Sequence, residues 1–181
     1  MTLSTIATSS IEEVSEAAPN CLKWFQLYIY KDRSVTEQLV RRAEKCGFKA
    51  LVLTVDTPMF GQRLADARNR FHLPPHLRMA NFDRGKTASD SIQNSPTKAS
   101  SGLNEYALSL FDSSITWKDV LWLKSVTKLP LVLKGILTRE DALLALKYGA
   151  SAILVSNHGA RQLDGVPSTV RCVYSGNKII N

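Results

Sequence analysis

The sequence predicts an α/β protein built around a parallel β-sheet. Short apolar segments alternate with amphipathic segments along much of the chain, and several apolar segments lack the alternating polar residues of a half-exposed strand. Strands that are apolar throughout and separated by helices belong to a parallel sheet that is covered on both faces. With 181 residues and 44% hydrophobic content, the chain is large enough to bury one sizeable core.

The first predicted unit lies at the start of the chain. Residues 1–6 read as the end of a strand. Ser10 and Glu13 have the spacing of a capping box, in which each side chain bonds the backbone of the other residue, and this predicts a short helix that ends near Ala18.

The next unit is predicted from a similar pattern. Residues 23–30 (KWFQLYIY) indicate a buried strand, and Ser34 with Glu37 predicts a capping box that opens a helix ending at Gly47. Residues 50–55 (ALVLTV) then indicate a strand too apolar to have a face in water.

The pattern returns in the second half of the chain. Thr116 is expected to cap a helix, and residues 129–133 (LPLVL) predict the strand after it. Residues 138–148 repeat the helix pattern, Gly149 stops that helix, and residues 152–155 predict one more strand. In the helix that Thr116 caps, the residues that we expect to face the core are Val120, Leu121, Leu123 and Val126.

Two segments depart from this alternation. Residues 56–104 are rich in Pro, Asn, Arg, Lys and Ser, which predicts a long loop, flexible over about residues 70–104 and most clearly at 90–102. Residues 167–169 (PST) resemble the start of a helix, but residues 171–181 contain Ser, Gly and Asn and predict no helix. The latter segment is expected to be a divergent tail.

Composition excludes several classes of protein. The net charge of +7 is spread along the chain with no basic block among aromatic residues, so we expect attraction of anionic substrates rather than nucleic-acid binding. Cys21, Cys46 and Cys172 have neither zinc-site nor disulfide spacing. No apolar run has the length of a membrane span, so neither a membrane nor a metal is an expected partner.

Polar residues stand where the predicted strands end. In parallel barrels the functional groups collect just beyond the carboxyl ends of the strands. An unpaired buried Gln, Thr or Lys costs roughly 1 to 3 kcal/mol, so repeated polar strand ends indicate a shared ligand. Lys134 either extends to solvent or stabilises negative charge on an electron-accepting ring. The residues selected are Gln26, Tyr28, Thr54, Asp56, Lys134, Ser156, His158 and Arg161.

The run SNHGARQLDG, residues 156–165, carries the strongest chemical signal. It places His158 and Arg161 in one Gly-containing turn. Histidine is readily poised as a base near neutral pH, and arginine binds a carboxylate through two parallel hydrogen bonds. These residues therefore indicate chemistry on an organic acid, the alternative being a loop histidine beside a solvated charge.

Four motifs resemble one family. They are WFQLYIYKDR, GFKALVLTVDTP followed by Gly61 and Arg63, LPLVLKGILTREDA, and SNHGARQLDGVPST. Together, over roughly residues 2–170, they resemble the FMN-dependent 2-hydroxyacid oxidases, the group of glycolate oxidase and the long-chain hydroxyacid oxidases. The resemblance implies that residues 1–170 form a partial (β/α)8 barrel of about five parallel strands with covering helices, with FMN at the carboxyl ends of the strands.

The resemblance also implies residue roles. His158 would take a proton from the alpha carbon or the hydroxyl of the substrate, and Asp56 would stabilise the imidazolium that forms. The implied substrate-binding residues are Tyr28, Arg63, His158 and Arg161. The implied FMN-binding residues are Ser4, Gln26, Thr54, Lys134 and Ser156.

The chain departs from the family pattern in two ways. Ile6 stands in Ser4-Thr5-Ile6 where glycolate oxidase has Trp, which favours a longer or bulkier hydroxyacid. The opening helices, the early strands and a substrate-site tyrosine are missing at one end, and the FMN-phosphate segment is missing beyond Thr169. The sequence therefore predicts a fragment that, by itself, retains FMN weakly or not at all.

The expected reaction converts a 2-hydroxyacid into a 2-oxoacid, with oxygen as acceptor and hydrogen peroxide as product. A cytochrome or quinone acceptor is the alternative, because it would use the same residues. The parent protein is expected to be a homo-oligomer. Relatives are commonly peroxisomal, so the resemblance implies a peroxisomal location. The chain ends in Lys178-Ile-Ile-Asn181 without a targeting signal, which makes the cytoplasm the other expected location.

Overall fold

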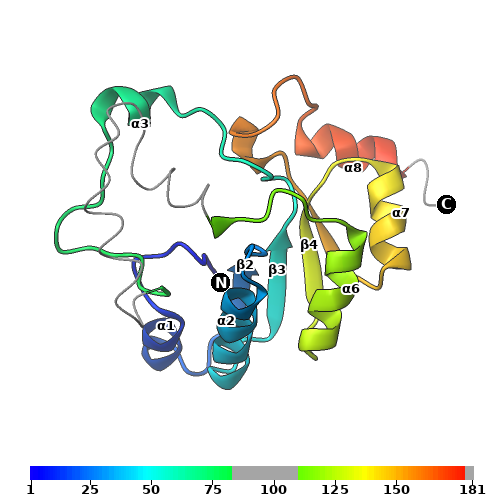
Figure 1. The fold of residues 1–181 in the computed structure, drawn as a ribbon. Coiled ribbons are helices and arrows are strands. Elements are labelled where there is room, and N and C mark those ends of the chain that lie inside the picture. The colour runs from blue at the N-terminus through cyan, green and yellow to red at the C-terminus, as the bar shows by residue number, and fades with distance from the viewer. Residues whose placement is uncertain (83–109, 178–181) are drawn as a thin grey trace.

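A computed structural model describes residues 1–82 and 110–177 and forms a five-stranded parallel sheet in the order β1-β2-β3-β4-β5 (Figure 1). The strands are β1 (Thr2–Leu3), β2 (Trp24–Leu27), β3 (Ala50–Thr54), β4 (Leu131–Ile136) and β5 (Ala152–Val155). The helices are α1 (Ile11–Ala17), α2 (Arg33–Lys45), α3 (Leu64–Asn69), α6 (Trp117–Val126), α7 (Arg139–Lys147) and α8 (Thr169–Asn177), with a 3₁₀ turn, η1 (His158–Ala160). The predicted parallel sheet is confirmed.

The strand order identifies a barrel type of sheet. Each strand pairs with the next one along the chain, and right-handed crossovers then place all the connecting helices on the same face. One large core cluster joins helix residues such as Leu39 and Leu123 to every second residue of β2, β3 and β4. The strand residues in that cluster include Phe25, Leu27, Leu51, Leu53, Leu131 and Leu133.

The opposite face of the sheet is covered differently. Among the described residues it carries a small separate cluster of Ala50, Val52 and Val132 with Trp24 beside it. In a closed barrel this face is the interior, filled by side chains from the other strands. The strands therefore pack under helices on one face and face the barrel interior on the other, as expected for part of a barrel.

The predicted helix starts are partly confirmed. Ser10 Oγ accepts from the Glu13 amide at 3.1 Å, and Glu13 Oε2 accepts from the Ser10 amide at 2.7 Å, so this capping box is present. Thr116 caps α6 as expected. The box at Ser34 is wrong, because Asp32 is the N-cap of α2 and accepts from the Ser34 amide at 2.9 Å. A carboxylate is favoured there since the N-terminus of a helix carries partial positive charge.

One burial prediction is also wrong. Leu121 is 50% exposed, whereas Leu123 is fully buried, so the inward face of α6 is narrower than expected. Strand β5 is partly exposed, with Ile153 and Leu154 each at 38%. Within the described residues β5 pairs only with β4, so it lies at an edge of the sheet.

The two irregular segments are more ordered than predicted. The expected loop contains the helix α3, while residues 90–102 lie outside the described part of the chain. The C-terminal segment forms α8, which contradicts the prediction of no helix. Cys172 and Val173 of α8 line a cavity of about 670 Å³ together with Ile153 and Val155 of β5.

Arg33 joins α2 to the start of α6. Its guanidinium contacts Asp112 at 2.6 Å, Asp119 at 2.7 Å and the Tyr30 carbonyl at 2.6 Å. Hydrogen bonds from Ser114, together with Arg33, lower the pKa of Asp112 to about 2. This network ties the first residue of α2 to the first turn of α6. No helix in the described ranges is both long and apolar enough to cross a membrane.

The buried face of β4 predicts an unequal response to alanine. Leu133→Ala is expected to lower the free energy of unfolding by about 2 to 5 kcal/mol, because Leu133 is fully buried and its removal leaves a cavity. The matched change Leu121→Ala, on the exposed side of α6, is expected to cost less than about 0.5 kcal/mol. Urea unfolding measures both, and equal losses would contradict the assigned core.

Candidate active site

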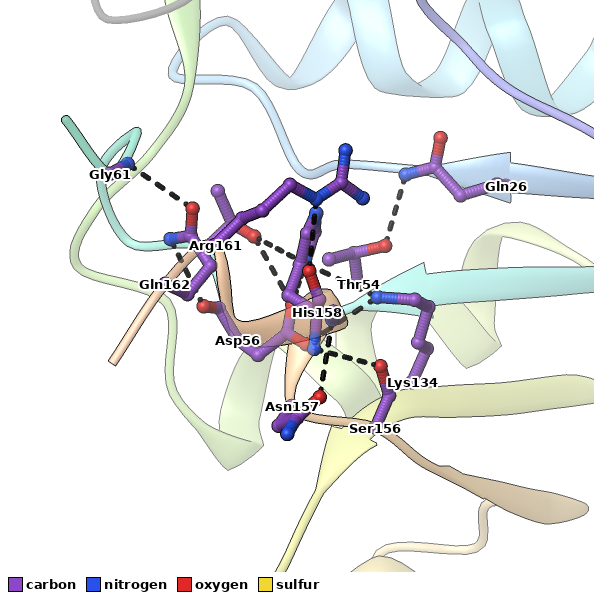
Figure 2. A network of polar contacts seen from close by, with 12 residues as sticks. Gln26, Thr54, Asp56, Gly61, Lys134, Ser156, Asn157, His158, Arg161 and Gln162 are labelled. Carbon is purple, nitrogen blue, oxygen red and sulfur yellow. Dashed lines mark hydrogen bonds and ion pairs between the residues drawn. The ribbon is translucent and has the colours of Figure 1, made fainter. Parts of the chain in front are cut away.

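The predicted site residues gather at the carboxyl edge of the sheet. Thr54 at the end of β3 is paired in register with Lys134 of β4, and Gln26 lies on the neighbouring strand β2 (Figure 2). All three alternate with the helix-facing residues, so their side chains leave the sheet on the face opposite the helices. Asp56 follows β3 by two residues, and His158 begins the turn after β5.

Asp56 and His158 form the centre of the site. His158 Nδ1 lies 2.8 Å from Asp56 Oδ1, although the two residues are 102 positions apart in the chain. Lys134 Nζ lies 3.4 Å from the other carboxylate oxygen and 3.2 Å from the same imidazole nitrogen. The carboxylate, the imidazole and the ammonium group therefore all contact one another (Figure 2).

These contacts assign the imidazole proton. An ammonium group only donates hydrogen bonds, and a carboxylate only accepts them. Because the shortest contact joins Nδ1 to Asp56, we place the proton on Nδ1 and let Lys134 donate to the second oxygen of Asp56. The other ring nitrogen, Nε2, then holds a lone pair and is the atom able to accept a proton.

The turn that carries His158 has an unusual backbone. His158, Gly159 and Ala160 all have positive φ, at 58°, 64° and 57°. This conformation costs roughly 1 to 2 kcal/mol for a residue with a Cβ atom. Ser156 Oγ accepts from the His158 amide at 3.0 Å and Asn157 Oδ1 from the Gly159 amide at 3.1 Å, which stabilises the turn.

Gly135 allows Asp56 to approach β4. Its φ is +113°, and a Cβ atom at this position would lie 2.5 Å from Asp56 Cβ and 2.7 Å from Asp56 Cγ. Such separations are far below van der Waals contact. The register of β4 with β5 also shifts at this point, between Lys134 and Ile136. A glycine is thus required to bring the carboxylate against Lys134.

A second chain of hydrogen bonds runs across β1, β2 and β3. Ser4 Oγ donates to Gln26 Oε1 at 3.3 Å, and Gln26 Nε2 donates to Thr54 Oγ1 at 3.0 Å. The Thr5 amide also donates to Gln26 Oε1, at 3.1 Å. These contacts fix the orientation of an amide and a hydroxyl beside the ammonium of Lys134.

The remaining predicted residues surround this centre. Tyr28 is buried and stacks on Phe111 with ring centroids 4.3 Å apart. Burial raises the pKa of the Tyr28 hydroxyl and the Asp56 charge adds to this, while a hydrogen bond with Thr57 and the charges of Arg63 and Arg161 oppose it. Both guanidinium groups therefore act on the same phenol.

The two guanidinium groups differ in their surroundings. Arg63 Nε is buried without a hydrogen-bond partner among the described residues, and its guanidinium lies 5.3 Å from the centre of the Phe60 ring. Arg161 is exposed, and its Nε donates to the His158 carbonyl at 3.0 Å. A buried donor left unpaired costs about 1 to 3 kcal/mol, so the position of Arg63 favours an anionic ligand.

Two residues of the site were not predicted. Thr57 Oγ1 lies 3.1 Å from Asp56 Oδ1 and 3.2 Å from His158 Nδ1. Gln162 connects the turn after β5 to the segment after β3 through its side-chain amide. Each residue is adjacent in sequence to a selected residue, Thr57 to Asp56 in the DTP motif and Gln162 to Arg161 in the ARQ motif. This adjacency was the only feature of the sequence that could have identified them.

A sequential parallel sheet with polar groups at its carboxyl edge is the arrangement of part of a (β/α)8 barrel. The sequence matches the FMN-dependent dehydrogenase family over residues 1–178, a range that includes α8. The chain therefore belongs to the FMN-dependent dehydrogenase family.

Individual relatives agree with this assignment. The chain is 57% identical over 170 residues to human 2-hydroxyacid oxidase 1, covering 94% of this chain and 45% of that protein. It is 54% identical over 173 residues to glycolate oxidase 3 of Oryza sativa subsp. indica, covering 96% of this chain and 46% of the relative. The chain thus spans less than half the length of these relatives.

A solved structure supports the barrel assignment. The crystal structure of mandelate oxidase with (S)-4-hydroxymandelic acid superposes with a TM-score of 0.84 at 41% identity. The match covers 97% of this chain and 47% of mandelate oxidase. The prediction of a partial barrel is confirmed.

The donor set at the sheet edge fits FMN, the cofactor of the family. A flavin ring presents carbonyl oxygens and ring nitrogens, which are complementary to the amide of Gln26, the hydroxyl of Thr54 and the ammonium of Lys134. These groups are oriented by the hydrogen bonds described above. Within the described ranges, no group of three or more His, Cys, Asp or Glu side chains could hold a metal ion.

The contact between Gly135 and Asp56 predicts a specific defect. Gly135→Ala is expected to cost about 1 to 3 kcal/mol of unfolding free energy and to displace Asp56 from His158, because the added methyl group overlaps Asp56. Urea unfolding and the NMR signals of the His158 ring measure the two effects.

Gly47→Ala is the matched control. Gly47 also has positive φ, at +75°, but a Cβ atom there would contact nothing within 4 Å. Gly47→Ala is expected to lower the free energy of unfolding through backbone strain alone and to leave the NMR signals of the His158 ring unchanged. A His158 ring that responds equally to both variants, or to neither, would contradict the steric role of Gly135.

Proposed function

We propose that the protein to which these residues belong oxidises a 2-hydroxyacid to a 2-oxoacid with FMN as cofactor. The observation that carries the proposal is the 2.8 Å contact between His158 Nδ1 and Asp56 Oδ1 at the carboxyl edge of the sheet. It supplies a base where (β/α)8 barrels place their functional groups. The family assignment and the relatives named 2-hydroxyacid oxidase and glycolate oxidase support the same reaction.

His158 is the proton acceptor in this proposal. With its Nδ1 proton directed at Asp56, its Nε2 lone pair is free to take a proton from the alpha carbon or the hydroxyl of the acid. Asp56 then stabilises the imidazolium that forms. Bound FMN would supply the oxidising power by accepting the two electrons and the second hydrogen that leave the substrate, as a hydride from the alpha carbon when His158 takes the hydroxyl proton, or as an electron pair and the hydroxyl proton when His158 takes the alpha proton and leaves a carbanion.

The substrate carboxylate is bound by Arg63 and Arg161, with a hydrogen bond from Tyr28. Arginine suits this role because its planar guanidinium matches a carboxylate with two parallel hydrogen bonds. The unpaired buried Nε of Arg63 and the influence of both charges on Tyr28 support a common anion site. His158 also contacts the substrate in this arrangement.

The flavin is held by Ser4, Gln26, Thr54, Lys134 and Ser156. The hydrogen-bonded chain from Ser4 to Thr54 presents oriented polar groups, and the Lys134 ammonium stabilises negative charge that develops beside it. The Ser156 hydroxyl accepts a hydrogen bond from the His158 amide. In the proposal the same hydroxyl also contacts the flavin, so it connects the base to the cofactor.

The electron acceptor and the cellular context are part of the proposal. Oxygen as acceptor, with hydrogen peroxide as product, is favoured by the relatives named oxidase. A cytochrome or quinone acceptor is the alternative. A peroxisomal location and a homo-oligomeric parent protein follow from the family resemblance alone.

Ile6 indicates the size of the substrate. It stands where the resemblance places Trp in glycolate oxidase, and it is half-buried against the large core cluster. A branched aliphatic side chain occupies less space than an indole. We therefore propose a 2-hydroxyacid longer or bulkier than glycolate.

A second candidate is supported by the length of the chain relative to its relatives. A chain that spans less than half of them and leaves β5 exposed is expected to retain FMN weakly or not at all by itself. Visible absorbance after purification with added FMN tests this candidate. Tight stoichiometric flavin binding by the 181 residues would contradict it.

The proposed roles predict separate kinetic effects in a flavin-loaded protein that contains this chain. His158→Ala is expected to lower kcat by at least about 100-fold while FMN stays bound, because the base is lost. Arg161→Lys is expected mainly to raise KM, because an ammonium replaces a two-pronged donor. Steady-state peroxide release with 2-hydroxyacids of increasing chain length measures both effects and the role of Ile6.

Lys118→Ala, on the exposed surface of α6, is the control for loss of a charge. Near-normal turnover of the His158 variant would remove this residue from the proposed reaction. An unchanged KM in the Arg161 variant would remove Arg161 from the anion site. A preference for glycolate over longer acids would contradict the interpretation of Ile6.

A further inference from the structure

Gln162 makes three hydrogen bonds that no proposed catalytic role explains. Its Nε2 donates to the carbonyl of Met59 at 2.7 Å and to that of Asp56 at 3.3 Å. Its Oε1 accepts from the Gly61 amide at 3.2 Å. The side-chain amide is thus fully engaged with the backbone of one segment, residues 56–61 (Figure 2).

The two segments also approach each other closely. A Cβ atom on Gly61 would lie 2.1 Å from the carbonyl oxygen of Arg161 and 3.5 Å from Gln162 Oε1. Only glycine fits at this distance. The backbone contact and the Gln162 amide therefore join the segment after β3 to the turn after β5 at one point.

This junction is adjacent in sequence to both arginines. Arg161 immediately precedes Gln162, and Arg63 follows Gly61 by two residues. Gly61 and Gln162 are 101 positions apart in the chain. The two arginines beside them therefore belong to segments that are distant in sequence. The separation of the arginines in space therefore depends on how these segments are held together.

We propose that Gln162 is a positioning residue that sets the spacing of Arg63 and Arg161 by tying the segment 56–61 to the turn after β5. The idea rests on the proposed function, in which both arginines bind one carboxylate. Gln162 itself touches neither the substrate nor the reacting atoms. Its effect is to preorganise the anion site, so that binding of the carboxylate does not have to order the segment 56–61 first.

The same tie bears on the base. Gln162 bonds the backbone carbonyl of Asp56, whose side chain orients His158. The carboxylate has further contacts with Lys134 and Thr57, so it stays in place without Gln162. Loss of the tie is therefore expected to weaken anion binding much more than proton transfer.

The test uses the 181-residue chain and two NMR readouts. Hydrogen exchange of the Gly61 amide reports the tie directly. Titration with lactate, which is not oxidised without FMN, reports the anion site through the Nε–Hε signals of Arg63 and Arg161. Gln162→Met keeps the length and volume of the side chain but has no amide, and Gln162→Ala removes both.

Matched variants control for nonspecific effects. Gln62→Ala removes an exposed glutamine next to Gly61 and is expected to change neither readout. Gln162→Glu keeps an acceptor for Gly61 but cannot donate to Asp56 and Met59, so it is expected to retain part of the Gly61 protection. The urea midpoint of each variant separates a local change from global unfolding.

In Gln162→Met we expect exchange of the Gly61 amide to rise by at least about tenfold and lactate affinity to fall by about tenfold, with the urea midpoint nearly unchanged. Unchanged Gly61 exchange would overturn the tie. Faster exchange with unchanged lactate affinity would overturn its role in spacing the arginines. A global loss of protection in Gln162→Met, including the amides of β3, would also overturn the proposal, because Gln162 would then be a general stability residue.

Failure of the proposed function gives a different pattern. If lactate leaves the Arg63 and Arg161 signals of the unmodified chain unchanged while Gln162→Met still releases Gly61, the tie is present and the anion site is not. That result would overturn the role of Gln162 because there would be no anion site to position. Unchanged Gly61 exchange would overturn it for another reason, because Gln162 would not hold the segment.

Discussion

The structure of the site depends on one hydrogen bond, from His158 Nδ1 to Asp56 Oδ1. It joins residues from the ends of β3 and β5, two strands that are not neighbours and have β4 between them. Lys134 of β4 fills the intervening position and contacts both partners. Three strand ends thus contribute one group each, and the Asp56 carboxylate offsets the positive charge of the Lys134 ammonium beside it.

The sheet explains why these groups meet. In a sequential parallel sheet every strand points the same way, so residues far apart in the chain end at one edge. Alternation along each strand then divides the side chains, with Phe25 and Leu133 packed under the helices and Gln26 and Lys134 on the opposite face. Gly135 and the strained turn at His158 supply the close approaches that regular strands do not allow.

Much of this arrangement was predictable from the sequence. The apolar strands, the capping residues Ser10 and Thr116, and the polar strand ends are local patterns, and local patterns are legible in one chain. The exposure of Leu121 and β5, and the helix α8, depend on which elements pack together, which periodicity does not reveal. Thr57 and Gln162 were missed because their roles come from contacts about a hundred residues away along the chain. The family motifs indicated where the site lies but not how its atoms pair.

The proton position on the neutral His158 ring, measured by ¹⁵N NMR, tests the assigned hydrogen bond to Asp56 most directly. We predict a protonated Nδ1 and an Nε2 with a free lone pair, and loss of this preference in Asp56→Ala. A neutral ring protonated at Nε2, or a tautomer that does not respond to removal of Asp56, would contradict this prediction.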